Sequence, residues 1–231
     1  MKKYQHIFFD LDHTLWDCDR NSAEALKELI EEYQLDQLGI ELAPLVEAFD
    51  WANHQLWLQL DAGEISKQVV IEGRFPLVFE RLEIDRSHMN PELGAAYEAK
   101  SPRKPHLVPH AQELLDHLQR RDYCLHLITN GGPEQFIKLE HAQIGHYFEG
   151  VFTSHSTQSR KPQPAIFNQA LLETQALIEE SLMIGDSVRA DVNGAQGIGL
   201  DVILFNAKRK AHQAQPTHEV HCLSEIFGIL A

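Results

Sequence analysis

Residues 1–17 read MKKYQHIFFDLDHTLWD, in which the apolar run IFF at residues 7–9 leads straight into Asp10 and Asp12. A run of this kind predicts a buried strand. Burying one carboxylate beside apolar groups is costly, and two carboxylates close together repel each other. Because side chains alternate along a strand, Asp10 and Asp12 would project the same way if the strand continued through them. We therefore expect a strand whose carboxyl end holds a pair of acids that a ligand completes.

Further short apolar runs predict the rest of a sheet, with the last of its strands near residue 205. These runs lie at residues 125–129, 150–153, 182–184 and 201–205. Helical patterns accompany them at residues 110–121, 134–142, 165–174 and 188–197. Strand alternating with helix predicts a parallel sheet that helices cover on both faces. The expected fold class is α/β, with a doubly wound, Rossmann-like core.

The gap after the first strand predicts a separate, inserted domain. Helical patterns fill it at residues 22–33, 42–60, 66–82 and 91–99. Its flanks differ in composition, because residues 17–21 are polar and residues 100–109 read KSPRKPHLVP. Flanks of this composition suit a pair of hinges. We expect residues 1–17 and 105–231 to form the α/β core and residues 18–104 to form a helical insert.

Polar segments also follow later strands of the predicted sheet. In an open parallel sheet, ligands bind beyond the carboxyl ends of the strands, where the strand order reverses. Thr129, Asn130 and Gly131 supply a hydroxyl, an amide and flexible backbone N–H groups, which suit a tetrahedral oxyanion. Lys161 precedes a helix, where it would supply a point charge to a phosphoryl group. These segments predict an anion site at one edge of the sheet.

A hard cation would relieve the repulsion between Asp10 and Asp12. Asp186 follows another strand and would add a third carboxylate, with Asp191 as a ligand or as a brace for one. Histidine does not form the pattern of a metal site, because the 14 histidines are scattered along the chain. We therefore expect a magnesium-type site of carboxylates.

The segments DLDHT, ITNG, SRKP and GDSVRAD, in this order, resemble the four motifs of the haloacid dehalogenase-like hydrolase superfamily. The helical insert resembles the cap of that superfamily, which would select the substrate by closing over the site. The resemblance implies phosphoryl transfer through a phospho-aspartate on Asp10, with Asp12 as the general acid and base. It implies Mg²⁺ held by Asp10, the backbone carbonyl of Asp12 and Asp186. Thr129 and Lys161 would grip the phosphoryl group, with help from Asn130.

Asp12 narrows the expected chemistry further. Dehalogenases of the superfamily lack an aspartate at this position, so the resemblance favours a phosphatase. General acid catalysis needs Asp12 protonated at the right moment. We therefore expect its neighbours to hold the pKa of Asp12 above that of Asp10.

Residues 128–167 resemble the noncanonical pyrimidine nucleotidases, which cleave nucleoside 5′-monophosphates. Gln135 and Lys138-Leu139 follow TNG as in the TNG…Q…RL pattern of that family, with lysine where arginine is usual. Trp16 is the candidate residue for stacking on a base, because it follows the catalytic loop. The aromatic residues of the insert are expected to form mostly the core of the cap. These are Tyr33, Phe49, Trp51, Trp57, Phe75, Phe79 and Tyr97.

Other functions remain open at this point. Phosphoglycolate phosphatases and other small-metabolite phosphatases share much of the nucleotidase pattern. A sugar phosphomutase would need cap residues that the sequence does not identify. A phospho-aspartate switch without turnover is a different class, and Asp12 argues against it because an acid there should accelerate loss of the phosphoryl group.

The amino-acid composition limits the kinds of partner expected for this protein. The formal net charge of −14 argues against a nucleic-acid polymer or an anionic membrane as partner, because both need a basic face. We expect a small phosphorylated metabolite as the substrate and either a monomer or a homodimer. The three cysteines form no CxxC or disulfide framework, and the first residues carry no signal-peptide pattern. These features predict a cytoplasmic protein.

Overall fold

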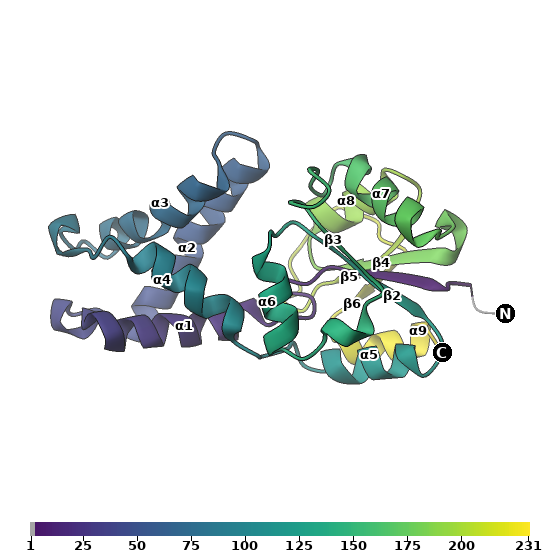
Figure 1. Ribbon diagram of the computed structural model, residues 1–231, viewed down its shortest axis with the longest axis horizontal. Coiled ribbons are helices and arrows are strands. Elements are labelled where there is room, and N and C mark those ends of the chain that lie inside the picture. The colour runs from purple at the N-terminus through teal and green to yellow at the C-terminus, as the bar shows by residue number, and fades with distance from the viewer. Residues whose placement is uncertain (1–2) are drawn as a thin grey trace. The chain divides into compact units, whose positions relative to one another are not determined.

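The computed structural model describes residues 3–231, which form two compact units. The first unit holds the chain up to Cys18 together with Pro105–Ala231, and the second is Asp19–Lys104. The second unit is thus an insertion between the first strand and the rest of the sheet (Figure 1).

The first unit contains a parallel sheet. Its strands are β1 (His6–Phe9), β2 (Cys124–Thr129), β3 (Gly150–Thr153), β4 (Ser181–Gly185), β5 (Asp201–Phe205) and β6 (His218–Val220). They lie in the order β3-β2-β1-β4-β5-β6, and each neighbouring pair is parallel. The predicted α/β fold class and the first five strands are confirmed. The sequence pattern missed β6, because this edge strand has three residues and buries only Val220.

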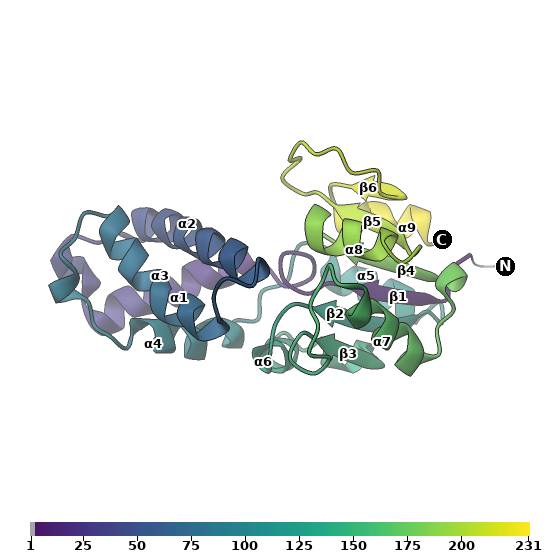
Figure 2. The ribbon, with the colours of Figure 1, turned by 90° about the horizontal axis from the view of Figure 1, so that it is seen from above.

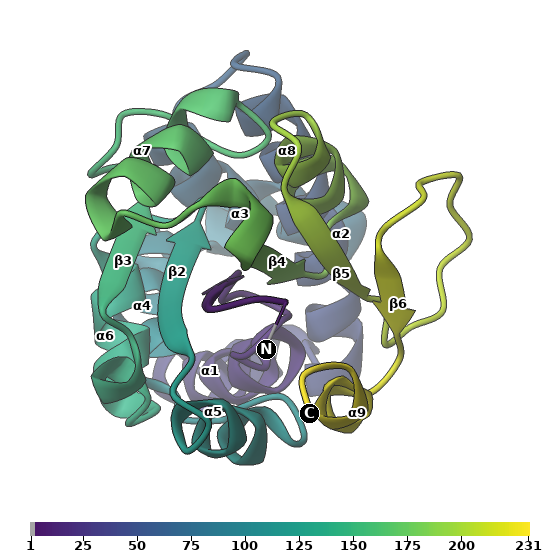
Figure 3. The ribbon, with the colours of Figure 1, turned by 90° about the vertical axis from the view of Figure 1, so that its right-hand side faces the viewer.

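Helices cover both faces of the sheet, as predicted. They are α5 (Ala111–Gln119), α6 (Glu134–His141), α7 (Pro164–Thr174), α8 (Asn193–Gln196) and α9 (Ile226–Ile229). Figure 3 shows α7 and α8 on one side of the sheet and α5 and α9 on the other. Ile7 and Phe9 pack into the cluster that includes α5 and α9, whereas Phe8 packs into the cluster that includes α7 and α8. The run IFF is therefore apolar throughout because its strand is buried on both faces.

The strand order indicates at which edge of the sheet a ligand can bind. From β1 the chain builds β2 and β3 on one side, and then it returns to β4 on the other side of β1. Beyond the carboxyl ends of such strands, at the point of reversal, an open sheet leaves a crevice for ligands. The segments after β1, β2 and β4 meet at this edge.

The inserted unit is helical and has its own core. Its helices are α1 (Cys18–Tyr33, beginning at the last residue of the first unit), α2 (Leu42–Asp61), α3 (Lys67–Arg81) and α4 (Leu93–Lys100) (Figure 2). Five of its aromatic side chains pack in this core, as expected: Tyr33, Phe49, Phe75, Phe79 and Tyr97. Trp51 and Trp57 lie outside it, where Arg81 sits 4.8 Å from the Trp51 ring and Lys67 sits 4.6 Å from the Trp57 ring.

Among residues 3–231, no helix combines the length and the apolar character that crossing a bilayer requires.

A buried histidine in the sheet makes the stability of the fold depend on pH. His126 on β2 is 1% exposed, stacks on His6 and Phe8, and has no hydrogen-bond partner at Nδ1. Burial, followed by the nearby His6, lowers the pKa of His126 to about 4. The unfolded chain then binds more protons than the folded chain below the ordinary histidine pKa of about 6.5. We expect this contribution to be complete above about pH 6.5 and to fall by about 2 kcal/mol as the pH drops to about 4.5.

The measurement is urea unfolding at pH 7.5 and at pH 4.5 for the wild type and for His126→Phe. The phenylalanine variant cannot take up a proton, so the difference between the two proteins reports on His126 together with its 3.1 Å contact to His6. The wild type should lose about 2 kcal/mol more than the variant between the two pH values. Parallel losses would show that His126 is protonated in the fold without cost.

Candidate active site

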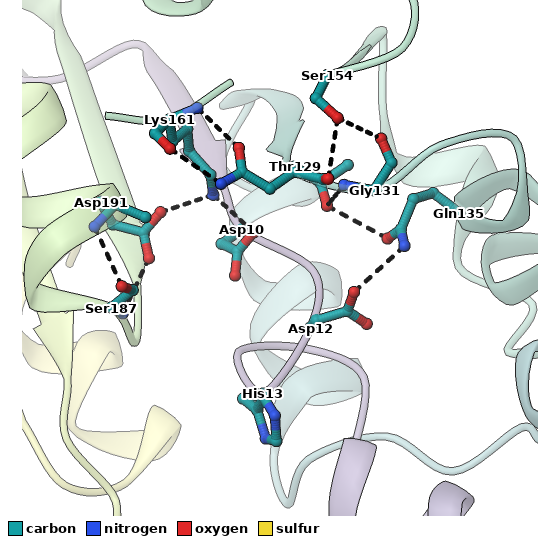
Figure 4. A network of polar contacts seen from close by, with 12 residues as sticks. Asp10, Asp12, His13, Thr129, Gly131, Gln135, Ser154, Lys161, Ser187 and Asp191 are labelled. Carbon is teal, nitrogen blue, oxygen red and sulfur yellow. Dashed lines mark hydrogen bonds and ion pairs between the residues drawn. The ribbon is translucent and has the colours of Figure 1, made fainter. Parts of the chain in front are cut away.

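The two acids after β1 have different surroundings. The backbone N–H of Asp10 donates to the carbonyl of Ile184 at 2.9 Å, which continues the pairing with β4, and Asp10 is 7% exposed. The chain then turns, with the N–H groups of Leu15 and Trp16 both donating to the carbonyl of Leu11 at 2.9 Å. β1 therefore ends before the acids, and each side chain finds its own partners (Figure 4).

Lys161 lies at the centre of the first group of partners. Its Nζ is 2.7 Å from Oδ1 of Asp10 and 2.6 Å from Oδ1 of Asp191, and the residue is 2% exposed. Asn130 fixes the Lys161 backbone, because its Nδ2 donates to the Lys161 carbonyl at 3.0 Å and its Oδ1 accepts from the Lys161 N–H at 2.7 Å. The segments after β2 and before α7 are thereby joined, and the lysine is aimed at Asp10.

Asp191 lies on a π-helical turn, Val188–Val192, that precedes α8. Its Oδ2 accepts from the backbone N–H of Ser187 at 2.9 Å, and the residue is fully buried. A Cβ on Gly185 would lie 2.3 Å from this carboxylate, so the end of β4 must be glycine for Asp191 to approach. The predicted helix at residues 188–197 thus begins as a wider turn that points Asp191 into the site.

Three carboxylates form a cluster that fits a hard divalent cation. Asp10, Asp186 and Asp191 each offer an oxygen, and these oxygens all lie within 4.8 Å of one another. Oxygen donors of this charge are what Mg²⁺ prefers, and three like charges at this spacing call for a cation. The side chain of Asp12 is not in this group. A role for Asp12 in the site of a cation therefore falls to its backbone carbonyl alone.

Thr129 at the end of β2 belongs to a second, connected network. Its Oγ1 accepts from the N–H of Gly131 at 3.3 Å and donates to Oε1 of Gln135 at 3.3 Å. Oγ of Ser154 donates to the carbonyls of Asn130 and Gly131, 2.9 Å away in each case. This bonding holds the TNG loop in one conformation, which Figure 4 shows beside Lys161 and Asp10.

Asp12 is held by residues of α6. Lys138 Nζ is 2.5 Å from its Oδ1, and Gln135 Nε2 donates to its Oδ2 at 3.2 Å. The Cys18 thiol lies 3.5 Å from the same Oδ1. Each acid of the opening stretch therefore has its own lysine, Lys161 for Asp10 and Lys138 for Asp12.

The pKa order of the two acids is the reverse of our expectation, which was wrong. Burial raises the pKa of Asp10 to about 7, with Asp191 adding to this and Lys161 opposing it. Burial also raises the pKa of Asp12, but the charge and hydrogen bond of Lys138 outweigh it and hold that pKa below its ordinary value. The resting site thus contains an ionised Asp12 beside an Asp10 that shares its surroundings with other carboxylates.

Trp16, the candidate for stacking on a base, is buried. It is 3% exposed, packs in the core cluster of the first unit, and has Lys138 Nζ 4.4 Å from its ring centroid. The structure therefore argues against an open aromatic face at Trp16. Trp16 does lie close to Asp12 in the chain, but its ring contacts Lys138 and the core.

Four residues that shape this site had no contact assigned to them from the sequence, where Gln135 and Lys138 stood only as part of the nucleotidase pattern. Gln135 and Lys138 hold Asp12, Ser187 supports Asp191, and Ser154 supports the TNG loop. The spacing of Gln135 and Lys138, three apart on a helix that starts just after a strand end, was the available signal. Ser154 follows β3 and so lies at the functional edge for the same reason as Thr129.

The doubly wound sheet and the acid–lysine site at its point of reversal define an enzyme of the hydrolase class. The chain belongs to the haloacid dehalogenase-like hydrolase family, whose model matches residues 7–205. It is 33% identical to the pyrimidine 5′-nucleotidase PynA of Streptococcus pneumoniae, over 98% of this chain and 95% of that protein.

Two further similarities agree. The chain is 28% identical to the pyrimidine 5′-nucleotidase YjjG of Escherichia coli, over 99% of this chain and 98% of that protein. The crystal structure of the putative HAD-hydrolase YfnB of Bacillus subtilis superposes with a TM-score of 0.86 and 28% identity, covering 99% of each chain. That structure is described as bound to magnesium and as revealing interdomain movement.

Proposed function

We propose that this phosphatase hydrolyses nucleoside 5′-monophosphates, with pyrimidine and modified pyrimidine nucleotides as preferred substrates. The observation that carries the phosphomonoesterase part is the pair of acids with separate lysines, Asp10 with Lys161 and Asp12 with Lys138. The nucleotide part is supported by the similarity over nearly the whole chain to two pyrimidine 5′-nucleotidases.

In the first step, an oxygen of Asp10 attacks the phosphorus, and the bond from phosphorus to the ester oxygen breaks. The product is an acyl-phosphate on Asp10, while the departing alcohol oxygen takes a proton from Asp12. A phosphate dianion beside Asp12 raises its pKa, since like charges disfavour ionisation. The substrate thus moves Asp12 from its resting carboxylate toward the acid that this step needs.

In the second step, Asp12 accepts a proton from a water molecule that attacks the acyl-phosphate. This attack releases inorganic phosphate and restores the Asp10 carboxylate. Splitting one difficult displacement into two is the general advantage of a covalent intermediate. Thr129 and Lys161 donate to the phosphoryl oxygens, and stabilising that charge is the main protein contribution in phosphoryl transfer.

Mg²⁺ fits the carboxylates that the structure brings together, and Asp10, Asp186 and the backbone carbonyl of Asp12 would hold it, with Asp191 as a brace. When bound, it would neutralise charge on the transferred phosphoryl group. Asp191 also contacts Lys161, so it orients the lysine and the acidic cluster at the same time.

Binding of Mg²⁺ should release protons from the cation-free protein near pH 6. The pKa of Asp10 lies at about 7, and that of Asp186 is raised well above its ordinary value, chiefly by burial and then by Asp10. Protons and Mg²⁺ compete for these oxygens. The affinity for Mg²⁺ should therefore rise about tenfold per pH unit up to pH 7 for each proton that binding displaces. Calorimetry at pH 6 in two buffers of different ionisation enthalpy measures the release.

Asp186→Asn is the control for this measurement, since it removes one of the titrating carboxylates and should weaken binding while releasing fewer protons. A wild-type affinity that stays constant between pH 5.5 and pH 7.5 would contradict the proposed cation site.

We further propose that the inserted unit, residues 18–104 as delimited from the sequence, serves as the cap that selects the substrate. The similarity to YfnB of Bacillus subtilis over 99% of each chain supports this role, because the structure of that protein is described as revealing interdomain movement.

The test of the proposed function is a panel of phosphorylated metabolites assayed with Mg²⁺ for release of inorganic phosphate. The panel holds deoxynucleoside and modified pyrimidine 5′-monophosphates, purine nucleotides, phosphoglycolate and sugar phosphates. We expect the highest kcat/KM on the pyrimidine monophosphates. A preference for phosphoglycolate or a sugar phosphate would replace the nucleotide part, and lack of turnover on every ester would remove the phosphatase mechanism.

A further inference from the structure

Two polar residues of helix α6 are buried, whereas one of its apolar residues is exposed. Gln135 is 1% exposed and Lys138 is 8% exposed, whereas Phe136 between them is 50% exposed. Placing a lysine and a glutamine inside is costly unless each finds a partner there. The rest of the helix follows the ordinary amphipathic pattern, with Leu139 buried and Glu140 exposed. Local exceptions such as Gln135 and Lys138 are expected where function overrides stability.

The partner of both side chains is one carboxylate. Lys138 contacts Oδ1 of Asp12 at 2.5 Å and Gln135 contacts Oδ2 at 3.2 Å, so each oxygen has its own donor from the same helix. Two donors at fixed positions define the rotation of a carboxylate group, which one donor would leave free. The plane of the Asp12 carboxylate is thereby set by α6.

Lys138 is itself braced. Its ammonium lies 4.4 Å from the centroid of the Trp16 ring, a cation–π contact in a buried setting. Trp16 belongs to the core cluster of the first unit, so the lysine is anchored to the rigid part of the fold. The loop that carries Asp12 needs such support, because β1 ends at Phe9 and His13 takes a φ of 62°.

Gln135 links the two halves of the site. Its Nε2 donates to Asp12 while its Oε1 accepts from Thr129. A Cβ on Gly131 would lie 2.2 Å from Nε2 of Gln135, so glycine at this position leaves the room that the glutamine occupies. Gln135 thus binds both Thr129, which we propose grips the phosphoryl group, and Asp12, which we propose protonates the leaving group.

We propose that Lys138 is a positioning residue for Asp12: braced on Trp16 and assisted by Gln135, it holds the Asp12 carboxylate where the leaving alcohol must receive its proton. This inference rests on the proposed function, specifically on Asp12 as the general acid and base. Lys138 makes no contact with the phosphoryl group in this role. The anion-binding lysine of the site is Lys161.

The test compares two substrates whose leaving groups differ in their need for a proton. The leaving group of an alkyl phosphomonoester is an alcohol, whose oxygen needs a proton in order to depart. The leaving group of p-nitrophenyl phosphate is p-nitrophenolate, a stable anion that needs little protonation. Displacing a catalytic group by about 1 Å costs about 10²-fold in rate. For Lys138→Met we therefore expect kcat/KM to fall about 10²-fold on the alkyl ester and less than about tenfold on the aryl ester.

Four further variants complete the design. Lys138→Arg keeps the charge and should recover most of the activity on the alkyl ester. Asp12→Asn should show the same selective loss, and adding Lys138→Met to it should cost nothing more, since the lysine acts through the carboxylate. Lys3→Met is the control, because Lys3 forms its ion pair with Asp201, at the opposite end of the sheet from the site.

Equal losses for Lys138→Met on both esters, or a double variant whose loss is the product of the single losses, would overturn the inference. If Asp12→Asn itself left the ratio of kcat/KM between the two esters unchanged, the result would contradict the proposed acid–base role of Asp12, on which this inference rests. Where Lys138→Met does not fold, Lys138→Gln with Lys138→Arg gives the same comparison. In that pair, only the arginine variant should keep the wild-type ratio.

Discussion

Replacing Asp10 by asparagine should reduce turnover of every phosphomonoester by about 10⁴-fold or more, which is the scale of losing a covalent nucleophile. The amide cannot form the acyl-phosphate, so the nucleophile beside Lys161 and the acidic cluster is lost. The measurement is kcat/KM with Mg²⁺ on the best substrate of the panel. Acid-quenched wild-type enzyme should also carry a phosphoryl group on Asp10 that hydroxylamine releases.

Asp10→Asn should fold. Asparagine has the size of aspartate, and Lys161 keeps its ion pair with Asp191 at 2.6 Å. Far-ultraviolet circular dichroism and the unfolding midpoint should therefore stay close to wild type, which separates a chemical loss from a structural one. Turnover within tenfold of wild type would show that another group attacks the phosphorus.

Lys161→Met should cause the second large effect, on stability and on activity together. The lysine is 2% exposed and neutralises Asp10 and Asp191, so its removal leaves carboxylates buried without their partner. Breaking a buried ion pair from one side costs about 3–5 kcal/mol. Loss of a charge that stabilises the transition state costs about 10²–10³-fold in kcat. Urea unfolding and steady-state kinetics measure the two effects.

A matched control comes from the opposite end of the sheet. Lys3 pairs with Asp201 at the same 2.7 Å, but its side chain is 65% exposed. Lys3→Met should cost at most about 1 kcal/mol and leave activity unchanged, because an exposed pair is screened by water. Mg²⁺ should restore part of the stability of Lys161→Met, since it brings positive charge to the same carboxylates. An unfolding free energy equal to that of Lys3→Met would contradict the structural role of Lys161.

Local patterns determined the fold of the core. The run IFF could be assigned to a buried strand because neighbouring side chains must face both sides of a covered sheet, and Phe8 indeed packs opposite Ile7 and Phe9. Strand ends followed from the same patterns, so the polar residues at those ends could be collected at one edge. The short strand β6 gave no such signal, since its burial depends on β5 beside it.

The residues of the candidate site were likewise predictable only in part from the sequence. The sequence supplied Asp10, Lys161, Asp186 and Asp191 as residues that should converge, and the structure brings them within contact or near it. The sequence also offered Trp16 as the candidate for stacking on a base, whereas in the fold this ring is buried in the core of the first unit. Side-chain direction in a loop depends on what packs around it, and periodicity carries no information on that.

The sequence by itself determined which chemical groups are present and at which edge of the sheet they stand, because strands and helices follow from local periodicity. Only the tertiary structure decided which lysine meets which acid. Lys161 reaches Asp10 from 151 positions away, and Lys138 reaches Asp12 from 126 positions away. Those contacts reverse the expected pKa order, because a carboxylate's pKa reflects the balance of burial and charge around it, and that balance exists only once the distant segments have packed together.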